Sequence, residues 1–254
     1  MTQQQSANPI EDLAKQAESR FRPLKLPSQL PCAATAGAQG RLDAALTSVN
    51  NVLLTMDLAR SLDKALKQRD IRGRLTETLV DLLRAAIAFA GAGLDASLKQ
   101  LIKDTIRDLS KKNDLARKKF TTFVEEHLAP ADASVNGRKL AEVLTSPGGI
   151  QEELLNRYER DLTGESLQSA QQVGNVCGAL GVDDRKLRER LKEGALLDGM
   201  FRARNQIVHE LDLTEAGRRP RKLDDARRYA EEALSVAQEI INAVTAQLIP
   251  KPAV

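Results

Sequence analysis

Apolar residues recur at spacings of three and four along most of the chain, which is the pattern of an α-helix with one buried face. The pattern covers residues 42–66 and resumes over residues 75–111. No segment alternates apolar and polar residues at period two, so no strand is predicted. We therefore expect an all-α protein. Further helices are expected at residues 150–161, 166–180, 185–192, 195–211 and 224–248, and a short one ends at residues 127–130.

The nine prolines divide the chain, because each proline lacks a backbone donor and breaks a helix interior. Three long stretches contain no proline and can hold long helices: residues 32–129, 148–219 and 221–249. This division suggests three parts. We expect a flexible N-terminal segment over residues 1–37, a helical arm over residues 38–71, and a helical domain with long antiparallel helices over residues 72–254.

The composition is that of a globular protein. Of the 254 residues, 42% are hydrophobic and 29% are charged, which is unlike a disordered chain. The uncharged run at residues 85–94 is far shorter than the ~20 residues that span a membrane. The N-terminus has no basic region followed by an apolar one, so no signal peptide is predicted. We expect a cytoplasmic protein with no membrane partner.

Few residues are suited to hold a metal ion or a cofactor. Cys32 and Cys177 are far apart and lie in no CxxC or CxxH setting, which argues against a disulfide scaffold and a cysteine-rich zinc site. The chain has two histidines, His127 and His209, too few for a multi-histidine metal centre. No glycine-rich phosphate-binding motif follows a strand-like run. We therefore expect no cofactor.

The most informative segment is the helix expected at residues 195–211. If it is wound at about 100° per residue, Arg204 lies in the centre of an apolar stripe that includes Leu197, Met200 and Val208. A guanidinium cannot lose its proton, so at such a position it needs a carboxylate, a phosphate or a solvated cleft. Two explanations remain open. Arg204 is either a structural residue that reaches a core acid or water, or part of a stripe that faces a second copy or a phosphate-binding cleft.

Asn205 and His209 lie four residues apart on the flank of this stripe. Imidazole is the side chain that titrates near neutral pH, which makes histidine a frequent general acid or base. A single histidine on a helix flank is nevertheless more often an ordinary hydrogen-bonded residue. The neighbouring Asn205 and Arg204 favour the chemical role.

The run Arg204-Asn-Gln-Ile-Val-His209 resembles the R-x(4–6)-H signature of the HEPN superfamily, in which a polar residue directly after the arginine is typical. The setting is also similar: a motif helix, a basic loop and a final amphipathic helix. The upstream helix, in which Asp95 is the only charge within residues 85–98, resembles the early core helix of that family. The RiboL-PSP-type HEPN proteins are the most similar group. The resemblance covers about residues 74–248 in layout.

This resemblance implies a HEPN-like helical bundle with an N-terminal helical extension, and a metal-independent endoribonuclease of the toxin or antiviral-defence type. Such enzymes are usually homodimers in which two motif helices meet at a shared cleft, and they often have an antitoxin or sensor protein as a further partner. RNA supplies its own 2′-hydroxyl nucleophile. His209 would be the acid/base, Arg204 would hold the scissile phosphate and Asn205 would orient one of them.

Asp95 would hold Arg204 or select the His209 tautomer, but pairing with Lys99 four residues on is an equally good explanation. Two alternatives to the nuclease stay open. One is a catalytically inactive HEPN-like helical module that binds RNA or a protein, and the other is a structural helical protein in which Arg204 and His209 are ordinary residues.

Basic residues cluster after the motif helix, although the formal net charge is only +3. Such residues can hold phosphates that flank a cleavage site, or they can simply form a solvated loop. Aromatic residues make up 3% of the chain, too few for recognition of single-stranded bases by stacking, so structured RNA such as tRNA is the expected substrate. The predicted RNA-binding residues are Arg202, Arg218, Arg219, Arg221 and Lys222.

Overall fold

The computed structural model describes residues 9–67, 76–128 and 143–249, and these residues confirm the all-α prediction. A small antiparallel hairpin, β1 (Leu213–Thr214) paired with β2 (Gly217–Arg218), lies where sequence analysis expected only a polar loop. The helices are α1 (Pro9–Arg20), the 3-10 turn η1 (Ala33–Thr35), α2 (Ala36–Lys67), α3 (Glu77–Lys112), α4 (Asp114–Leu128), α6 (Ile150–Gly164), α7 (Ala170–Ala179), α8 (Arg185–Arg190), α9 (Leu196–Glu210) and α10 (Leu223–Leu248).

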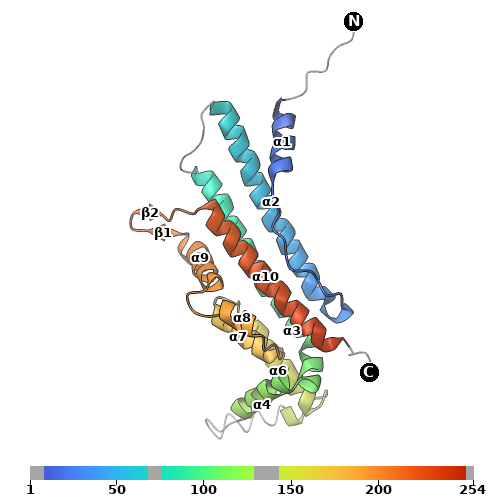
Figure 1. The fold of residues 1–254 in the computed structure, drawn as a ribbon. Helices are drawn as coiled ribbons and strands as arrows, with labels where there is room; N and C mark the ends of the chain where they lie inside the picture. Colours follow the sequence, from blue (N-terminus) through green and yellow to red (C-terminus); the bar gives the residue numbers. More distant parts are fainter. Residues whose placement is uncertain (1–8, 68–75, 129–142, 250–254) are drawn as a thin grey trace.

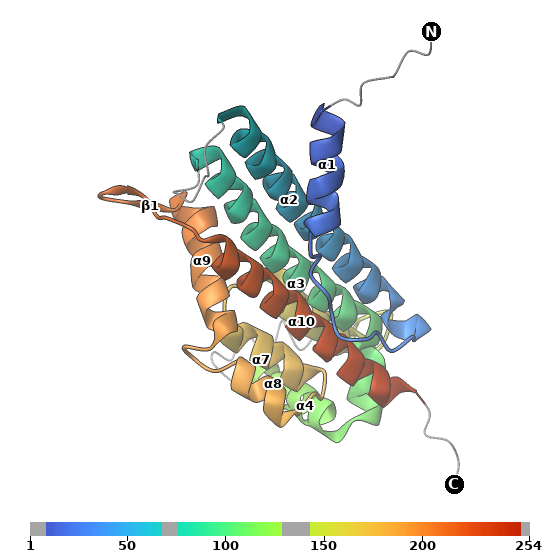
Figure 2. The same ribbon diagram turned by 45° about the horizontal axis from the view of Figure 1, so that its top comes forward.

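Three long helices, α2, α3 and α10, lie side by side and form the centre of the molecule (Figures 1 and 2). Helix α2 runs antiparallel to the other two, so its C-terminal half meets the N-terminal ends of α3 and α10. The helices approach closely at Gly93, where a Cβ atom would lie 2.2 Å from the Cβ of Ala45. Any larger residue at position 93 would therefore push α2 away from α3.

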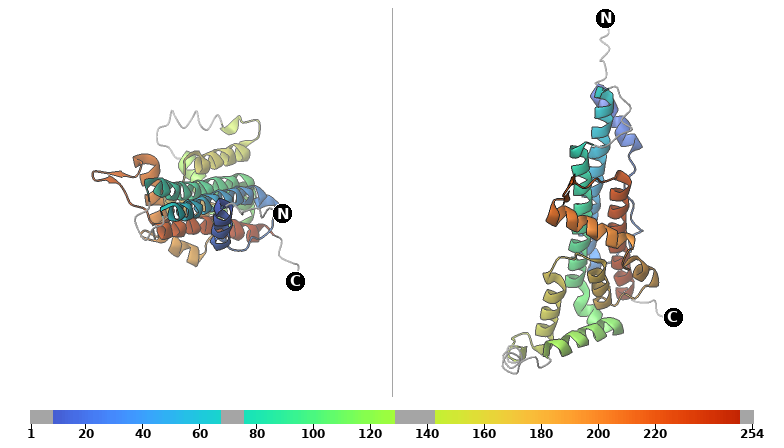
Figure 3. Two further views of the ribbon diagram at one scale, coloured as in Figure 1. Left: turned by 90° about the horizontal axis from the view of Figure 1, so that it is seen from above. Right: turned by 90° about the vertical axis from the view of Figure 1, so that its left-hand side faces the viewer.

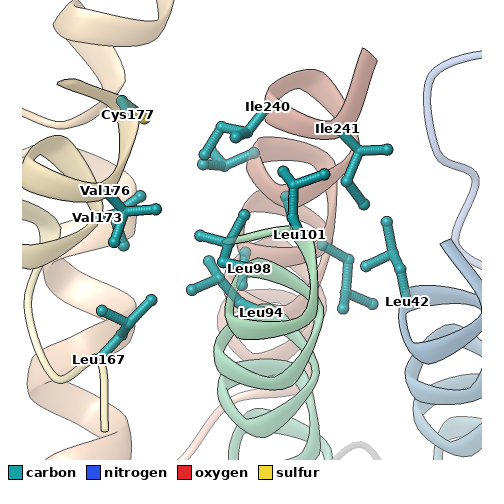
Figure 4. Close-up of a cluster of buried hydrophobic side chains, with 14 of the residues drawn as sticks. Leu42, Leu94, Leu98, Leu101, Leu167, Val173, Val176, Cys177, Ile240 and Ile241 are labelled. Carbon is teal, nitrogen blue, oxygen red and sulfur yellow. The ribbon is translucent and has the colours of Figure 1, made fainter. Parts of the chain in front are cut away.

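Leucine and isoleucine side chains fill the space between these helices (Figure 4). Leu94, Leu98 and Leu101 of α3 lie between α10 and the shorter helix α7. This arrangement follows from the three-and-four spacing in the sequence, because residues at that spacing share one helix face. The labelled partners of these leucines in Figure 4 are Leu42, Leu167, Val173, Val176, Cys177, Ile240 and Ile241.

The shorter helices flank the long ones, with α6 on one side and α7 and α8 on the other (Figure 3). Arg107 of α3 holds α6 through Glu152 at 3.1 Å and Glu159 at 2.5 Å. Arg190 of α8 binds Glu232 of α10 at 2.7 Å. These ion pairs fix the flanking helices, and α9 then crosses the long helices near the hairpin end (Figure 1).

The described part of the N-terminal segment packs on the long helices. Leu24 is buried, and its backbone N–H donates to Asn50 Oδ1 at 2.8 Å. The Leu30 N–H donates to Asn242 Oδ1 of α10 at 3.1 Å. Residues 21–32, expected as part of a flexible segment, therefore connect α1 to both α2 and α10. Helix α2, most of which lies in the range expected as a helical arm, shares its core with α3 and α10. Among the described helices, none is long and apolar enough to cross a membrane.

Candidate active site on helix α9

Helix α9 buries only the first half of its apolar stripe. Leu197, Met200 and Phe201 are buried against α3 and α10. The stripe continues past Arg204. There Ile207 is partly buried and still packs on the core, whereas Val208 is 46% exposed and Leu211, just after the helix, is 63% exposed. Arg204 is therefore placed at the boundary between a covered and an uncovered half of the same face.

Arg204 is partly buried and lies over Gly91 of α3. A Cβ atom at position 91 would lie 3.2 Å from the Cγ of Arg204, so glycine leaves the room that this side chain occupies. The Arg204 Nη1 donates to Asn205 Oδ1 at 3.0 Å. No carboxylate among the described residues lies within 4.0 Å of the Arg204 guanidinium. The explanation that pairs Arg204 with a core acid thus finds no support in residues 9–67, 76–128 and 143–249.

Asn205 connects Arg204 to the segment that precedes α7. The Nδ2 of Asn205 donates to the Gln168 carbonyl at 3.1 Å. Next to it, the Leu167 N–H donates to Asp95 Oδ1 at 2.8 Å. Asp95 therefore does not hold Arg204 directly. It fixes the backbone that fixes Asn205, and Asn205 in turn accepts from Arg204.

Asp95 also pairs with Lys99 at 3.2 Å, the contact that sequence analysis gave as the alternative to a site role. His209 lies in the last turn of α9 and is exposed. Within the described ranges, its ring takes part in no ion pair with Asp95 or another acid. The imidazole is thus accessible to a ligand, five residues beyond Arg204 on the same helix.

A buried charge cluster, which sequence analysis did not assign, closes the C-terminal end of α9. Asp212 is completely buried and accepts from Arg84 Nε at 3.0 Å and from Arg221 Nε at 2.9 Å. Burial alone would raise the pKa of Asp212, but the hydrogen bonds from Arg221 and Arg84 outweigh it and hold that pKa below its ordinary value. The carboxylate therefore stays ionised.

The backbone at this helix end adopts an uncommon conformation. Leu211 and Asp212 have φ of 51° and 59°, in the left-handed region that costs residues with a Cβ about 1 kcal/mol each. The Asp212 N–H donates back to the Gln206 carbonyl at 2.8 Å, which closes the helix. The Asp212 ion pairs hold this turn in place, and His209 lies directly before it.

The predicted RNA-binding residues fall into two groups. Arg221 binds Asp212, and Arg218 binds Glu77 at 3.1 Å, so both guanidiniums are engaged within the chain. Arg218 also binds Asp81 at 2.8 Å. The remaining three are available on the surface to different degrees. Arg202 pairs with Asp198 at 3.0 Å, but its side chain is 67% exposed. Arg219 and Lys222 have no short ion pair in the described part of the chain.

No group of three or more His, Cys, Asp or Glu residues that could hold a metal ion occurs among the residues the structure describes.

Comparison with protein families gives one result that covers most of the chain. The model of the RiboL-PSP-HEPN family matches residues 55–246, which include all of α3 and the motif helix α9. Comparisons with curated proteins and with solved structures found no match.

Proposed function

The chain belongs to the RiboL-PSP-HEPN family, and from this premise we propose that it is a metal-independent endoribonuclease whose site is formed by Arg204, Asn205 and His209 of α9. Family membership by itself favours a ribonuclease-like or RNA-binding function. The alternative, an inactive helical module that binds RNA or a protein, would use the same surface without cleaving.

One observation carries the proposal. Arg204 is a permanent cation that is partly buried, held by Asn205 and not neutralised by any described carboxylate, and the exposed His209 follows five residues later on the same helix. A structural arginine at such a position would be expected to bind an acid of its own chain. An arginine that is oriented but unpaired is suited to bind an anion from outside, and a phosphodiester fits its two parallel donors.

The reaction needs no more than these groups. The 2′-hydroxyl oxygen of the RNA attacks the adjacent phosphorus, and the bond from phosphorus to the 5′ oxygen breaks. The products are a 2′,3′-cyclic phosphate and a 5′-hydroxyl end. A base takes the proton of the 2′-hydroxyl and an acid gives a proton to the departing 5′ oxygen, both of which imidazole can do. Arg204 would stabilise the charge that grows on the phosphate oxygens.

We extend the proposal to a homodimer, because each chain supplies one His209 while the reaction uses an acid and a base. The uncovered half of the α9 stripe supports this arrangement: Val208 and Leu211 are exposed apolar residues that a second copy would cover. Two such stripes packed together would bring both Arg204 side chains toward one anion. The substitution Val208→Glu is expected to convert the dimer to a monomer in size-exclusion chromatography with light scattering.

The biological role that we assign is that of a toxin or antiviral-defence ribonuclease, with tRNA as the first substrate to test and an antitoxin or sensor protein as partner. A nuclease of this kind stops growth when it is expressed alone. Growth arrest that Arg204→Ala relieves would support the assignment, whereas arrest that persists in this variant would separate toxicity from the site.

The direct test is incubation of the purified chain with tRNA in EDTA, followed by analysis of the RNA ends. The wild type is expected to leave 2′,3′-cyclic phosphate, and His209→Ala and Arg204→Ala are each expected to lower the rate by at least ~10²-fold. His127→Ala, which changes the other histidine, and Arg185→Ala, which removes an exposed arginine of α8, are the matched controls. A wild type that cleaves only with Mg²⁺, or that binds RNA without cleaving it, would overturn the proposal.

A further inference from the structure

A pocket of about 450 Å³ is lined by residues from the C-terminal half of α2, the N-terminal ends of α3 and α10, strand β2 and the segment that follows it. Pockets of this size are typical of sites for small organic ligands and are larger than a single ion requires. None of the residues of the α9 site lines it. The lining residues are Arg60, Glu77, Val80, Arg218, Arg219, Pro220, Arg221, Lys222, Leu223 and Asp224.

Positive charge dominates this lining. Five of the ten residues are arginine or lysine and two are acidic. Hydrogen bonds from Arg84 and Arg218 lower the pKa of Glu77, so this acid stays ionised and neutralises Arg218. Arg221 is likewise engaged with Asp212. Asp224 also lines the pocket, and the charge of Arg60 interacts with Asp57. Among the lining cations, Arg60, Arg219 and Lys222 are those without a short ion pair in the described part of the chain.

Arg219 has an unused donor at this pocket. Its Nε is buried and has no hydrogen-bond acceptor in the described part of the chain. The nearest Asp212 oxygen is 3.9 Å away, and that carboxylate already accepts from Arg84 and Arg221. The other contact of the guanidinium, Nη2 to Glu210 Oε2, is 3.5 Å long and partly solvated. An arginine donor that is buried without a partner costs free energy. An anion in the pocket would meet the exposed part of this guanidinium, since the Arg219 side chain is 37% exposed.

The start of α10 can add backbone donors, and its first turn also carries the acids Asp224 and Asp225. Helix α10 begins at this pocket, and Lys222 at its N-cap provides no side-chain cap. The first N–H groups of a helix have no acceptor within the helix, and its N-terminal end attracts anions. Between the cations lie three apolar residues, Val80, Pro220 and Leu223. The pocket thus combines anion donors with an apolar surface suited to the sugar or base that carries a phosphate.

The pocket is connected to the α9 site through shared contacts. Arg221 Nη2 donates to Gln206 Oε1 at 3.0 Å, and Gln206 lies between Arg204 and His209 on α9. Along α3, Val80 precedes Gly91, the residue under Arg204, by eleven positions, which is about 16 Å on the same side of the helix. An RNA strand that reaches beyond His209 can therefore meet the pocket several nucleotides away.

We propose that this pocket is a second phosphate subsite, which holds a phosphorylated nucleoside by Arg60, Arg219 and Lys222. This inference deepens the proposed function and rests on it where the nucleoside is part of the RNA substrate. The same chemistry would bind a free nucleoside monophosphate. If the phosphate belongs to the RNA substrate, the pocket residues contribute to the affinity for RNA. If it belongs to a free nucleoside monophosphate, they do not.

The test uses the full chain with His209→Ala, so that labelled tRNA stays intact while its dissociation constant is measured by fluorescence anisotropy over a range of salt concentrations. Each phosphate contact contributes about 0.7 to 0.9 to the slope of log affinity against log salt. Adding Arg60→Ala and Lys222→Ala is expected to lower this slope by about 0.7 to 0.9, because the subsite holds one phosphate. Arg219→Gln, which removes the charge at the unused donor, is expected to lower it by about half as much.

Arg185→Ala with Lys186→Ala is the matched control, because it removes two exposed cations of α8 and should leave the slope unchanged. Binding of AMP and UMP is measured by calorimetry on the same proteins. If a nucleotide binds the wild type but not the variant with Arg60→Ala and Lys222→Ala, the pocket takes a free nucleotide. The subsite is refuted if the pocket variant matches the α8 control with tRNA and neither nucleotide binds. Cleavage of tRNA by the chain with an intact His209 is a separate readout, so failure of the subsite and failure of the nuclease are distinguishable.

Discussion

Removal of the Asp212 carboxylate should destabilise the chain far more than removal of an exposed acid that binds the same arginine. Asp212 is fully buried, and Asp212→Ala would remove its hydrogen bonds with Arg84 and Arg221. Loss of one partner of a buried ion pair costs about 3 to 5 kcal/mol, because the remaining charge is left unpaired. Arg84 would keep Glu77 and Asp81, so we expect the lower end, about 3 kcal/mol.

The matched control is Asp81→Ala. Asp81 also binds Arg84, at 2.8 Å, but its side chain is 50% exposed. Exposed ion pairs contribute less than about 1 kcal/mol. In urea unfolding followed by circular dichroism, Asp212→Ala should lower the unfolding free energy about three times as much as the control. At about 2 to 4 °C per kcal/mol for a chain of this size, its melting temperature should fall by roughly 6 to 12 °C. Equal losses in the two variants would refute the role given to burial.

The same carboxylate predicts a pH dependence. The pKa of Asp212 is lowered in the folded chain from an ordinary value of 3.8, since the bonds from Arg221 and Arg84 outweigh burial. A lowered pKa stabilises the fold above the unfolded value, and this contribution is lost as the pH falls through the folded value. The stability difference between wild type and Asp212→Asn should therefore be constant near neutral pH and decrease below about pH 4. A difference that is unchanged at pH 2.5 would contradict this account.

Two further variants test other parts of the structure. Asp95→Ala removes the acceptor that fixes the segment held by Asn205, and should lower tRNA cleavage by about 10-fold through loss of positioning, whereas Lys99→Ala should change it by less than about 2-fold. Equal effects would show that Asp95 acts only through its pair with Lys99. Burial raises the pKa of the Cys177 thiol to about 12, so at pH 8 this thiol should react with a disulfide reagent only after urea unfolding, while the partly exposed Cys32 reacts in the native chain. Rapid reaction of both thiols in the folded protein would contradict the burial of Cys177.

Periodicity was sufficient to predict the helices after residue 36 and the odd position of Arg204, because both depend on residues that are neighbours along one helix. Helix α1 (Pro9–Arg20) was not predicted and lies within the segment expected to be flexible. The hairpin was missed because each strand has only two residues, too few to show alternation. Asp212 was missed for a different reason. Its partner Arg84 is 128 residues away in the sequence, and no local pattern shows that the end of α9 meets α3.

The same limit affects the basic loop. A cluster of arginines predicts affinity for phosphate only if those arginines lack acids of their own, and the acids that bind Arg218 and Arg221 come from α3 and from the end of α9. Arginines that are neighbours in the sequence therefore differ in whether an acid of the chain engages them. Arg219 and Lys222 remain suited to bind an anion, while Arg218 and Arg221 hold the hairpin and the helix end together.

The two halves of the α9 stripe explain why an arginine is stable at its centre. If the whole stripe were buried within the chain, Arg204 would need a buried acid, and if the whole stripe were exposed, nothing would orient its guanidinium. At the boundary, Gly91 and Asn205 fix the side chain while its charge stays accessible from the uncovered half. A second copy that covers Val208 and Leu211 would desolvate both arginines together, and their mutual repulsion would then favour an anion between them. On this argument, phosphate or RNA should strengthen dimerisation of the wild type and have no such effect on Arg204→Ala.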